Sequence, residues 1–174
     1  MLECLSVFSL PKLLRSPTRS NNRIGLGIGD LPKKSSREPR EAKLSATEIG
    51  FLKSNDLCRF ATASGKGEPH VVPVSYVWDQ NYAYIVTDYR TRKLRNLREN
   101  PHAAVLVDTG GTQKLLLISG PVEIIEKGEE YRRLYKLFYS KLSWVKRDPW
   151  KEGEAPFIKI TPRFKTGWGL GGKD

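Results

Sequence analysis

The amino-acid sequence predicts a mainly β fold of the α+β class, a small six-stranded antiparallel β-barrel with flanking helices. Six short segments rich in β-branched and aromatic residues are separated by turn-forming residues, as is typical of antiparallel sheets. Two or three other segments carry the apolar spacing or the terminal residues of helices. The chain has 174 residues, a length that suits one folded domain with a single core.

Charge and cysteine content exclude several classes of protein. The chain has 30 Lys and Arg against 19 Asp and Glu, a net charge of +11 that favours anionic partners. Its two cysteines, Cys4 and Cys58, are too few for a disulfide framework or a multi-cysteine metal site, so a reduced, cytoplasmic setting is expected. No apolar run reaches the ~18 residues of a membrane span, and no membrane-spanning segment is predicted.

Residues 1–43 are predicted to be a basic, disordered N-terminal segment, and residues 44–174 the folded domain. The first segment mixes Pro, Ser, Asn and Gly with basic residues and has too little apolar surface to offset the entropy of ordering its backbone. Its Arg- and Ser-rich composition equally suits an organelle transit peptide, and a start codon assigned too far upstream would give the same pattern. The run Gly25-x-Gly27-x-Gly29 lies beside no predicted strand or helix, which favours a linker over a dinucleotide-binding loop.

The folded part is predicted to start with a helix over 44–55. Ser45 precedes Glu48 by three residues, the spacing of a capping box, in which the two side chains bond free amides at the helix start. The β-rich run 57–63 then predicts a strand, and the two glycines within 64–67 predict a turn.

Two further strands are predicted over 70–78 and 82–87, joined by a turn at 79–81. Pro73 lies inside the first of them. Because proline has no amide donor, that strand is expected at a sheet edge or at a bulge. A short helix is predicted to follow over 91–99, where an Asn-Pro pair ends it.

The second half of the chain is predicted to contain three strands and one long helix. Two strands are expected over 103–108 and 114–125, and a Gly-Pro pair should bend the second midway. Apolar residues at spacings of three and four predict an amphipathic helix over 128–145. The last strand is predicted over 157–160, followed by a tail that contains Trp168.

Hydroxyls and cations surround the predicted junction between strand 82–87 and helix 91–99. A helix start offers unpaired amides and the positive end of the peptide dipole, which together bind anions such as phosphate. Thr87 adds a hydroxyl, while Arg92 can form two bonds to a phosphate whose charge Lys93 neutralises. We therefore predict a phosphate site here, and assign the remaining arginines of the helix to a solvated basic face.

A second candidate feature is the segment His70–Tyr76. Where Pro73 interrupts a β-ladder, neighbouring amides and carbonyls are free to meet the edge of a flat heteroaromatic ring. A proline-containing edge strand with no ligand role fits the same pattern, so this feature gains weight only in combination with others.

Taken together, the spaced motifs resemble the FMN-binding split-barrel family, the pyridoxamine 5′-phosphate oxidase-like superfamily that also contains deazaflavin (F420)-dependent reductases. The motifs span about residues 45–169 and comprise Arg59-Phe60-Ala61-Thr62, Glu68-Pro69-His70-Val71-Val72-Pro73-Val74, Thr87, Lys93-x-x-Asn96-Leu97, Asn100-Pro101, Gly120 and Trp168. The resemblance implies a six-stranded split β-barrel that forms a homodimer, with two flavins bound at the subunit interface. It also implies an FMN-dependent oxidoreductase that acts on a small molecule, whose identity the sequence does not reveal.

The same resemblance assigns cofactor-binding residues, but no catalytic residue and no metal ligand. It places Thr87, Arg92 and Lys93 on the cofactor phosphate. The flavin ring and ribityl chain would be lined by Arg59, Ala61, Thr62, His70, Val72, Pro73 and Val74, and a partner subunit would add Gln113 or Lys114 and Trp168. True pyridoxamine phosphate oxidases carry an Arg-Leu-x-Pro-like substrate motif near the C-terminus, and residues 161–165 depart from it, which argues against pyridoxal phosphate synthesis.

Two alternatives stay open on the sequence. The first keeps the fold and replaces FMN by F420, whose longer anionic tail suits the additional Arg90, Arg95 and Arg98. The second is a non-enzymatic basic barrel that binds nucleic acid by phosphate neutralisation and by base stacking on Tyr76, Tyr82 and Tyr84. Alternating aromatics in a strand more often belong to a core or a dimer interface, which makes nucleic acid the less favoured partner.

Overall fold

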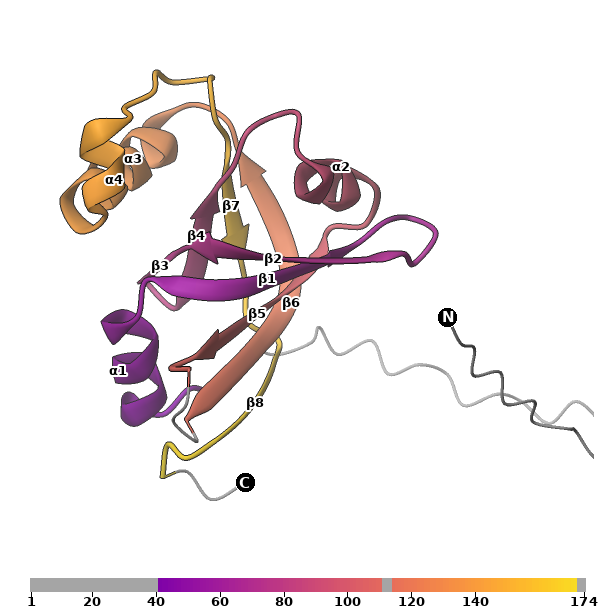
Figure 1. Cartoon of the computed structure of the whole chain (residues 1–174), viewed down its shortest axis with the longest axis vertical. Helices are drawn as coiled ribbons and strands as arrows, with labels where there is room; N and C mark the ends of the chain where they lie inside the picture. Colours follow the sequence, from indigo (N-terminus) through magenta and orange to yellow (C-terminus); the bar gives the residue numbers. More distant parts are fainter. Residues whose placement is uncertain (1–40, 111–113, 172–174) are drawn as a thin grey trace, which may run out of the picture. The chain divides into compact units, whose positions relative to one another are not determined.

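The computed structural model of the chain describes residues 41–110 and 114–171. In this part of the chain an antiparallel sheet curls into a half-open barrel with helices on its outside (Figure 1), which confirms the predicted fold class. Most of the predicted disordered segment, including the run Gly25–Gly29, lies outside the described residues. None of the described helices is long and apolar enough to cross a membrane.

The helices and strands follow the predicted order closely. In chain order they are α1 (Ala46–Ser54), β1 (Leu57–Ala63), β2 (Pro69–Ser75), β3 (Val77–Asp79), β4 (Tyr82–Val86), α2 (Arg92–Glu99), β5 (His102–Asp108), β6 (Leu115–Ile125), α3 (Glu129–Lys141), α4 (Ser143–Arg147), β7 (Phe157–Ile160) and β8 (Phe164–Trp168).

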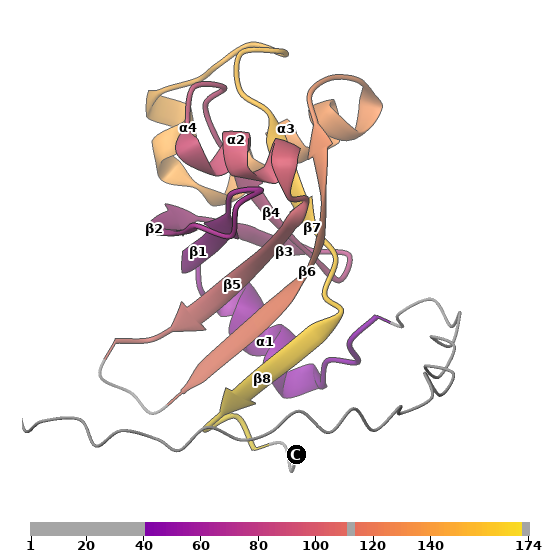
Figure 2. The same ribbon diagram turned by 90° about the vertical axis from the view of Figure 1, so that its right-hand side faces the viewer.

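The strands are hydrogen-bonded in the order β2-β1-β5-β6-β7-β4-β3, and β8 pairs with β6. The long strand β6 joins two parts of the sheet, because its first half pairs with β5 and β8 and its second half with β7. Figure 2 shows α2, α3 and α4 gathered at one end of the barrel and α1 toward the other. Among the described strands β2 pairs with β1 alone, so Pro73 lies on an edge strand as predicted.

Three elements differ from the prediction, and the described residues form eight strands rather than six. The run 70–78 divides at Tyr76, whose amide bonds the carbonyl of Asp56 at 2.9 Å and whose hydroxyl donates to the carbonyl of Leu52 at 2.7 Å. These contacts take Tyr76 out of the ladder, and β2 and β3 therefore form separate strands. The long helix 128–145 breaks at Leu142, which has extended backbone angles (φ −110°, ψ 112°).

The third difference is β8, which the sequence analysis treated as a tail. Its residues pair with β6 from Leu115 opposite Trp168 to Ser119 opposite Phe164. The link from β7 into β8 crosses β6 so closely that a side chain at Gly120 would meet the carbonyl oxygen of Thr161 at 2.0 Å. Glycine is therefore required at the predicted bend of β6, because no other residue leaves room for this crossing.

The apolar core has two parts. The first fills the barrel and includes Phe60, Val105 and Ile118, all fully buried. The second lies between the β4–β7 side of the sheet and the helices α3 and α4, where Tyr84 and Phe138 are fully buried. No helix of the described part of the chain covers the outside of the β2-β1-β5-β6-β8 face, which carries exposed apolar side chains.

Candidate cofactor site

Helix α2 is fastened to the β1–β2 hairpin by one of its faces. Arg92 pairs with Glu68 at 3.4 Å, Asn96 donates to the Thr62 hydroxyl at 3.1 Å, and the Glu99 carboxylate accepts from the amide of Gly65 at 3.0 Å. Positions 92, 96 and 99 share one face of a helix, so these contacts act together. They fix the N-terminus of α2 beside the start of β2 and its middle beside the end of β1. Asn96, which the resemblance gave a structural role, is buried.

The N-terminus of α2 has the features of an anion site. Its N-cap residue, Thr91, makes no side-chain bond to the first-turn amides, and the first turn holds no acidic residue. The Thr91 hydroxyl donates instead to the carbonyl of Asp88 at 2.9 Å and lies 3.1 Å from the hydroxyl of Thr87. The first turn of a helix leaves amide hydrogens without partners, and here the positive end of the dipole is not neutralised from within the helix.

Lys93 lies half-buried next to this helix start. Burial lowers the pKa of its ammonium, and the nearby charge of Asp88 offsets part of this effect. Among the described residues Lys93 has no hydrogen bond and no ion pair, although its charge is partly withdrawn from water. A bound phosphate would supply the missing partner, since a charged group with restricted access to water is stabilised by an opposite charge.

His70 provides a second polar atom in need of a partner. It lies directly across the β1–β2 ladder from Thr62, the residue that Asn96 of α2 contacts. Its Nδ1 atom is buried and meets no hydrogen-bond partner among the described residues. Buried polar atoms are rarely left unpaired in a folded protein, so His70 fits a place beside a ligand.

The pleat of the sheet divides the other predicted residues between two faces. Thr62, His70, Val72 and Val74 share the face toward the barrel interior, because Val72 lies opposite the fully buried Phe60 and Val74 opposite Cys58. The outer face carries the remaining predicted residues of the ladder, Arg59, Ala61 and Pro73, together with Trp168. One chain therefore does not enclose the whole predicted set, and Gln113 lies outside the described residues.

The outer face contains a groove of about 590 Å³ that sequence reasoning did not find. Its floor follows a row of cross-strand neighbours, Ala61, Ala104 and Ser119, which are small. The row ends in larger apolar side chains, Val71 on β2 and Phe164 on β8, which are 59% and 57% exposed. The groove is also lined by Thr62, Ala63, Pro69, Asn100, His102, Ala103, Gly120 and Arg163. Small residues in alternation on neighbouring strands are the only sequence signal for this groove, and the register is needed to align them.

Arg59 and Trp168 lie on the same outer face. Arg59 is exposed and its Nε atom lies 3.8 Å from a carboxylate oxygen of Asp108. Trp168, opposite Leu115, is 59% exposed. Neighbouring Cys58 is turned inward, where burial raises the pKa of its thiol to about 12 and keeps it protonated.

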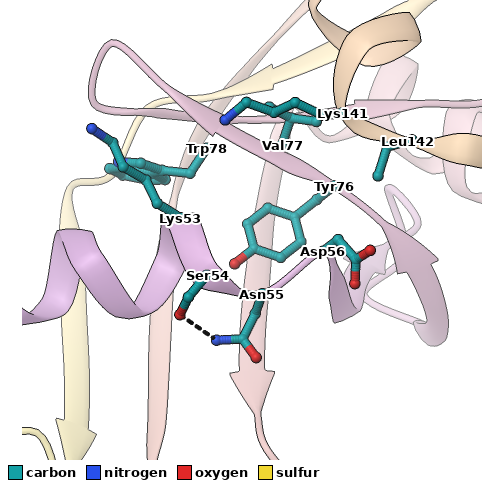
Figure 3. A pocket seen from close by; sticks show the side chains of 9 residues that line it. All are labelled: Lys53, Ser54, Asn55, Asp56, Tyr76, Val77, Trp78, Lys141 and Leu142. Atoms are coloured by element: carbon teal, nitrogen blue, oxygen red, sulfur yellow. Dashed lines mark hydrogen bonds between the residues drawn. The ribbon is translucent and has the colours of Figure 1, made fainter.

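Another pocket, of about 360 Å³, lies between the C-terminal ends of α1 and α3 (Figure 3). Tyr76 lines it together with Lys53 and Lys141, and none of the predicted cofactor residues does. Burial raises the pKa of the Tyr76 hydroxyl, which is fully engaged with Leu52. This pocket therefore lies apart from the candidate cofactor site.

The stacking platform that the nucleic-acid alternative requires is not formed by Tyr76 and Tyr84. Tyr76 and Tyr84 are buried in the two parts of the core. Tyr82 is half-buried, and the ammonium of Lys159 lies 4.6 Å from the centre of its ring. Two of the three tyrosines thus have no ring face open to a base, and the interpretation as core residues is correct for Tyr76 and Tyr84.

Comparison with known proteins agrees with this architecture. Residues 49–163 match the family model described as pyridoxamine 5′-phosphate oxidase. A 5a,11a-dehydrotetracycline/5a,11a-dehydrooxytetracycline reductase of Streptomyces rimosus is 33% identical over 95 residues, which cover 49% of this chain and 67% of the reductase.

Two solved structures illustrate the shared fold. HutZ, a heme storage protein from Vibrio cholerae, matches with a TM-score of 0.62 at 17% sequence identity. The match covers 70% of this chain and 92% of the HutZ chain. An F420 reductase matches with a TM-score of 0.51 at 24% sequence identity. The match covers 66% of this chain and 93% of the reductase chain. The family match over most of the folded part, together with the split-barrel topology, establishes that the chain belongs to the pyridoxamine 5′-phosphate oxidase family.

Proposed function

We propose that this protein is an FMN-dependent oxidoreductase that acts as a homodimer on a small molecule. The observation that carries the proposal is the start of α2, which combines first-turn amides without a capping side chain, the adjoining hydroxyls of Thr87 and Thr91, and the half-buried Lys93, which makes no ion pair among the described residues. Family membership and the likeness to a reductase support redox chemistry. Bound FMN supplies reversible two-electron transfer, and the protein contributes binding, orientation and exclusion of water.

The residues present fit an FMN phosphate and part of its ring. Thr87, Arg92 and Lys93 would hold the phosphate, and the buried Nδ1 of His70 would gain a partner. The outer-face residues Arg59, Ala61 and Pro73 would contact the remainder of the cofactor.

A second copy of the chain is part of this proposal. The predicted cofactor residues occupy both faces of the sheet, and one chain leaves the outer-face residues Arg59, Pro73 and Trp168 exposed to solvent. The outer face carries Val71, Phe164 and Trp168 with more than half of each side chain exposed. Exposed apolar groups of this kind mark an interaction surface. A second copy that covers this face would enclose the site and bring its own Trp168 toward it.

Reconstitution tests the proposed function. Purified protein offered FMN or F420 should retain FMN and show a flavin spectrum after removal of free cofactor. Lys93→Gln should weaken FMN binding about tenfold, because one charge-assisted contact to phosphate is lost. Arg95→Gln serves as the matched control, because this exposed side chain lies on α2 away from the phosphate site. A protein that retains no flavin, or binds it equally well without Lys93, would contradict the proposal.

F420 is the main alternative, and the same controls distinguish it. Arg98 is engaged, since it pairs with Glu126 at 3.4 Å and lies over the ring of Tyr89 at 5.9 Å. Arg90 and Arg95 are exposed and make no ion pair among the described residues, so they are the cations left for a longer anionic tail. If F420 is the cofactor, Arg95→Gln should weaken its binding, whereas FMN binding should not change.

A haem ligand is a second candidate because of one observation in the outer groove. Its lining is mostly apolar, and the exposed His102 stands in its wall. An apolar slot with an imidazole suits a haem face and its iron. Haem added to the purified protein should then give a haem-protein spectrum that His102→Ala abolishes. Retention of FMN without such a spectrum would favour the flavin.

A further inference from the structure

A separate cavity of about 270 Å³ lies between α3 and the segment 148–156 that precedes β7. Its lining residues are Tyr131, Arg132, Tyr135, Lys136, Trp150 and Glu152. None of them lines the outer groove, belongs to α2 or belongs to the predicted cofactor set. The volume suits a molecule of one or two rings.

The aromatic walls of this cavity are held in fixed positions. The indole Nε1 of Trp150 donates to the Tyr131 hydroxyl at 2.9 Å, and that hydroxyl donates to the carbonyl of Ala155 at 2.9 Å. Trp144 stacks on Trp150 with ring centres 5.8 Å apart, and Tyr135 meets Trp150 at 79° and 5.0 Å. Rings fixed in this way need little reorganisation to receive another ring.

The charges around the cavity leave one cation without a partner. Glu152 accepts from the amide of Gly128 at 2.6 Å and pairs with Arg132 at 3.4 Å, so both charges of that pair are engaged. Lys136, one turn further along α3, makes no hydrogen bond or ion pair within the described part of the chain. The lining therefore carries one uncompensated positive charge, which matches a monoanion.

We propose that this cavity is a binding site for a planar aromatic monoanion, an aryl carboxylate of one or two rings. The ligand ring packs against Tyr135 and Trp150, and its carboxylate pairs with Lys136. This site is independent of the proposed flavin site, since the two share no residue.

The test uses 2-naphthoate as probe and follows the indole Nε1–H signal of Trp150 in the full chain by NMR. The expected Kd is about 1 mM or tighter, and nuclear Overhauser contacts should connect the probe to the rings of Tyr135 and Trp150. Lys136→Gln should weaken binding about threefold, while Lys141→Gln, which removes an exposed charge of the same helix outside the cavity, should not change it. The neutral 2-naphthamide should bind wild-type protein about threefold more weakly than the acid and should not respond to Lys136→Gln.

Each opposite result overturns the proposal. No binding at 10 mM, on the order of ten times the expected Kd, would exclude the site. Equal binding of acid and amide, or equal effects of the two lysine variants, would show that Lys136 recognises no anion. Displacement of the probe by FMN would place it in the cofactor site instead. The direct titration of the probe contains no flavin and is read on Trp150, so its failure would not bear on the proposed function. A failure of the protein to bind FMN would likewise not bear on this site.

Discussion

The guanidinium of Arg92 lies 3.4 Å from the carboxylate of Glu68, so an acidic side chain of the β1–β2 hairpin holds a cation assigned to the cofactor phosphate. The two side chains are 47% and 65% exposed, and an ion pair this open to water is worth little. A phosphate bound at the proposed site at the start of α2 would therefore compete with Glu68 for Arg92, and it would also approach the negative charge of Glu68. On this proposal Glu68 would weaken anion binding.

Replacing Glu68 by glutamine should tighten FMN binding. The expected gain is about two- to fivefold at low ionic strength, because Arg92 is released and one repulsive charge is removed. Quenching of flavin fluorescence on titration measures it. Glu126→Gln is the matched control, since Glu126 holds Arg98 at the same distance of 3.4 Å but outside the predicted phosphate site. Weaker FMN binding by the Glu68 variant would contradict this prediction and would show that Glu68 orients Arg92 for the phosphate.

A charge on the outer face should separate the proposed dimer. Val71→Asp places a carboxylate on an apolar surface that a second copy would bury without a partner for the charge. We expect a dimeric wild type and a monomeric variant in analytical ultracentrifugation. Tyr139→Asp is the control, because Tyr139 is 44% exposed but lies on α3 rather than on the outer face. A monomeric wild type, or a Val71 variant that stays dimeric, would contradict a dimer through this face.

The sequence predicts best where the signal is local. The candidate phosphate-binding residues were expected at the junction of a strand and a short helix, and that junction is present between β4 and α2. The capping box of α1 is also present as predicted, with Glu48 accepting from the Ser45 amide at 2.6 Å. Long-range contacts decide the rest. Tyr76 looks like part of a continuous strand until its bonds to distant backbone carbonyls are known. Strand β8 contains a lysine and a glycine among its five residues, and only its pairing with β6 makes it a strand.

The division of the predicted cofactor residues between two faces of the sheet was not part of the sequence prediction. Adjacent residues of a strand point to opposite faces, so the side chain of Ala61 lies on the outer face and that of Thr62 on the face toward the barrel interior. The motif names both without this distinction. Prediction of the outer groove would also have required the strand register, because its floor combines residues of three strands that only the register places side by side.

Loss of the Asn96 side chain should destabilise the fold. Its amide donates to the hydroxyl of Thr62 at 3.1 Å, and both residues are buried. Asn96→Ala removes the donor and leaves Thr62 with an unpaired hydroxyl, which should lower the free energy of unfolding by about 1–2 kcal/mol. Urea denaturation measures the change. Arg95→Ala, on the exposed side of the same helix, should change it by less than about 0.5 kcal/mol, and equal effects of the two variants would show that the buried bond has no special weight.

The ion pair between Glu48 and Lys165 should make stability depend on pH. Burial raises the pKa of Glu48, but its bonds to Lys165 and Ser45 outweigh this effect and hold the pKa below its ordinary value of 4.5. A carboxyl with a lowered folded-state pKa stabilises the protein above the unfolded pKa and loses that contribution as the pH falls. Lys165→Gln should therefore cost about 1–2 kcal/mol at pH 7 and progressively less below pH 4.5.

The control for this pH dependence is Lys66→Gln, which removes an exposed charge that makes no ion pair among the described residues. Denaturant titrations of the three proteins between neutral and acid pH give the comparison. A Lys165 variant whose deficit stays constant as the pH falls would show that Glu48 does not titrate against Lys165.

Gly120 sets how closely β6 passes the link between β7 and β8, and alanine there should be strongly destabilising. The added Cβ would lie 2.0 Å from the backbone oxygen of Thr161, and a backbone atom cannot turn aside as a flexible side chain can. Backbone hydrogen bonds hold both sides of the crossing in place. The amide of Thr161 donates to the carbonyl of Pro121 at 3.0 Å, and the amide of Arg163 donates to the carbonyl of Ser119 at 2.8 Å. We expect Gly120→Ala to lower the free energy of unfolding by about 3 kcal/mol.

Gly50→Ala in α1 is the opposite control. Nothing lies within 4 Å of its new Cβ, so the free energy of unfolding should rise by about 0.5–1 kcal/mol. If Gly120→Ala were as stable as wild type in urea, the close crossing that positions Phe164 and Arg163 beside the outer groove would not be a constraint on this fold.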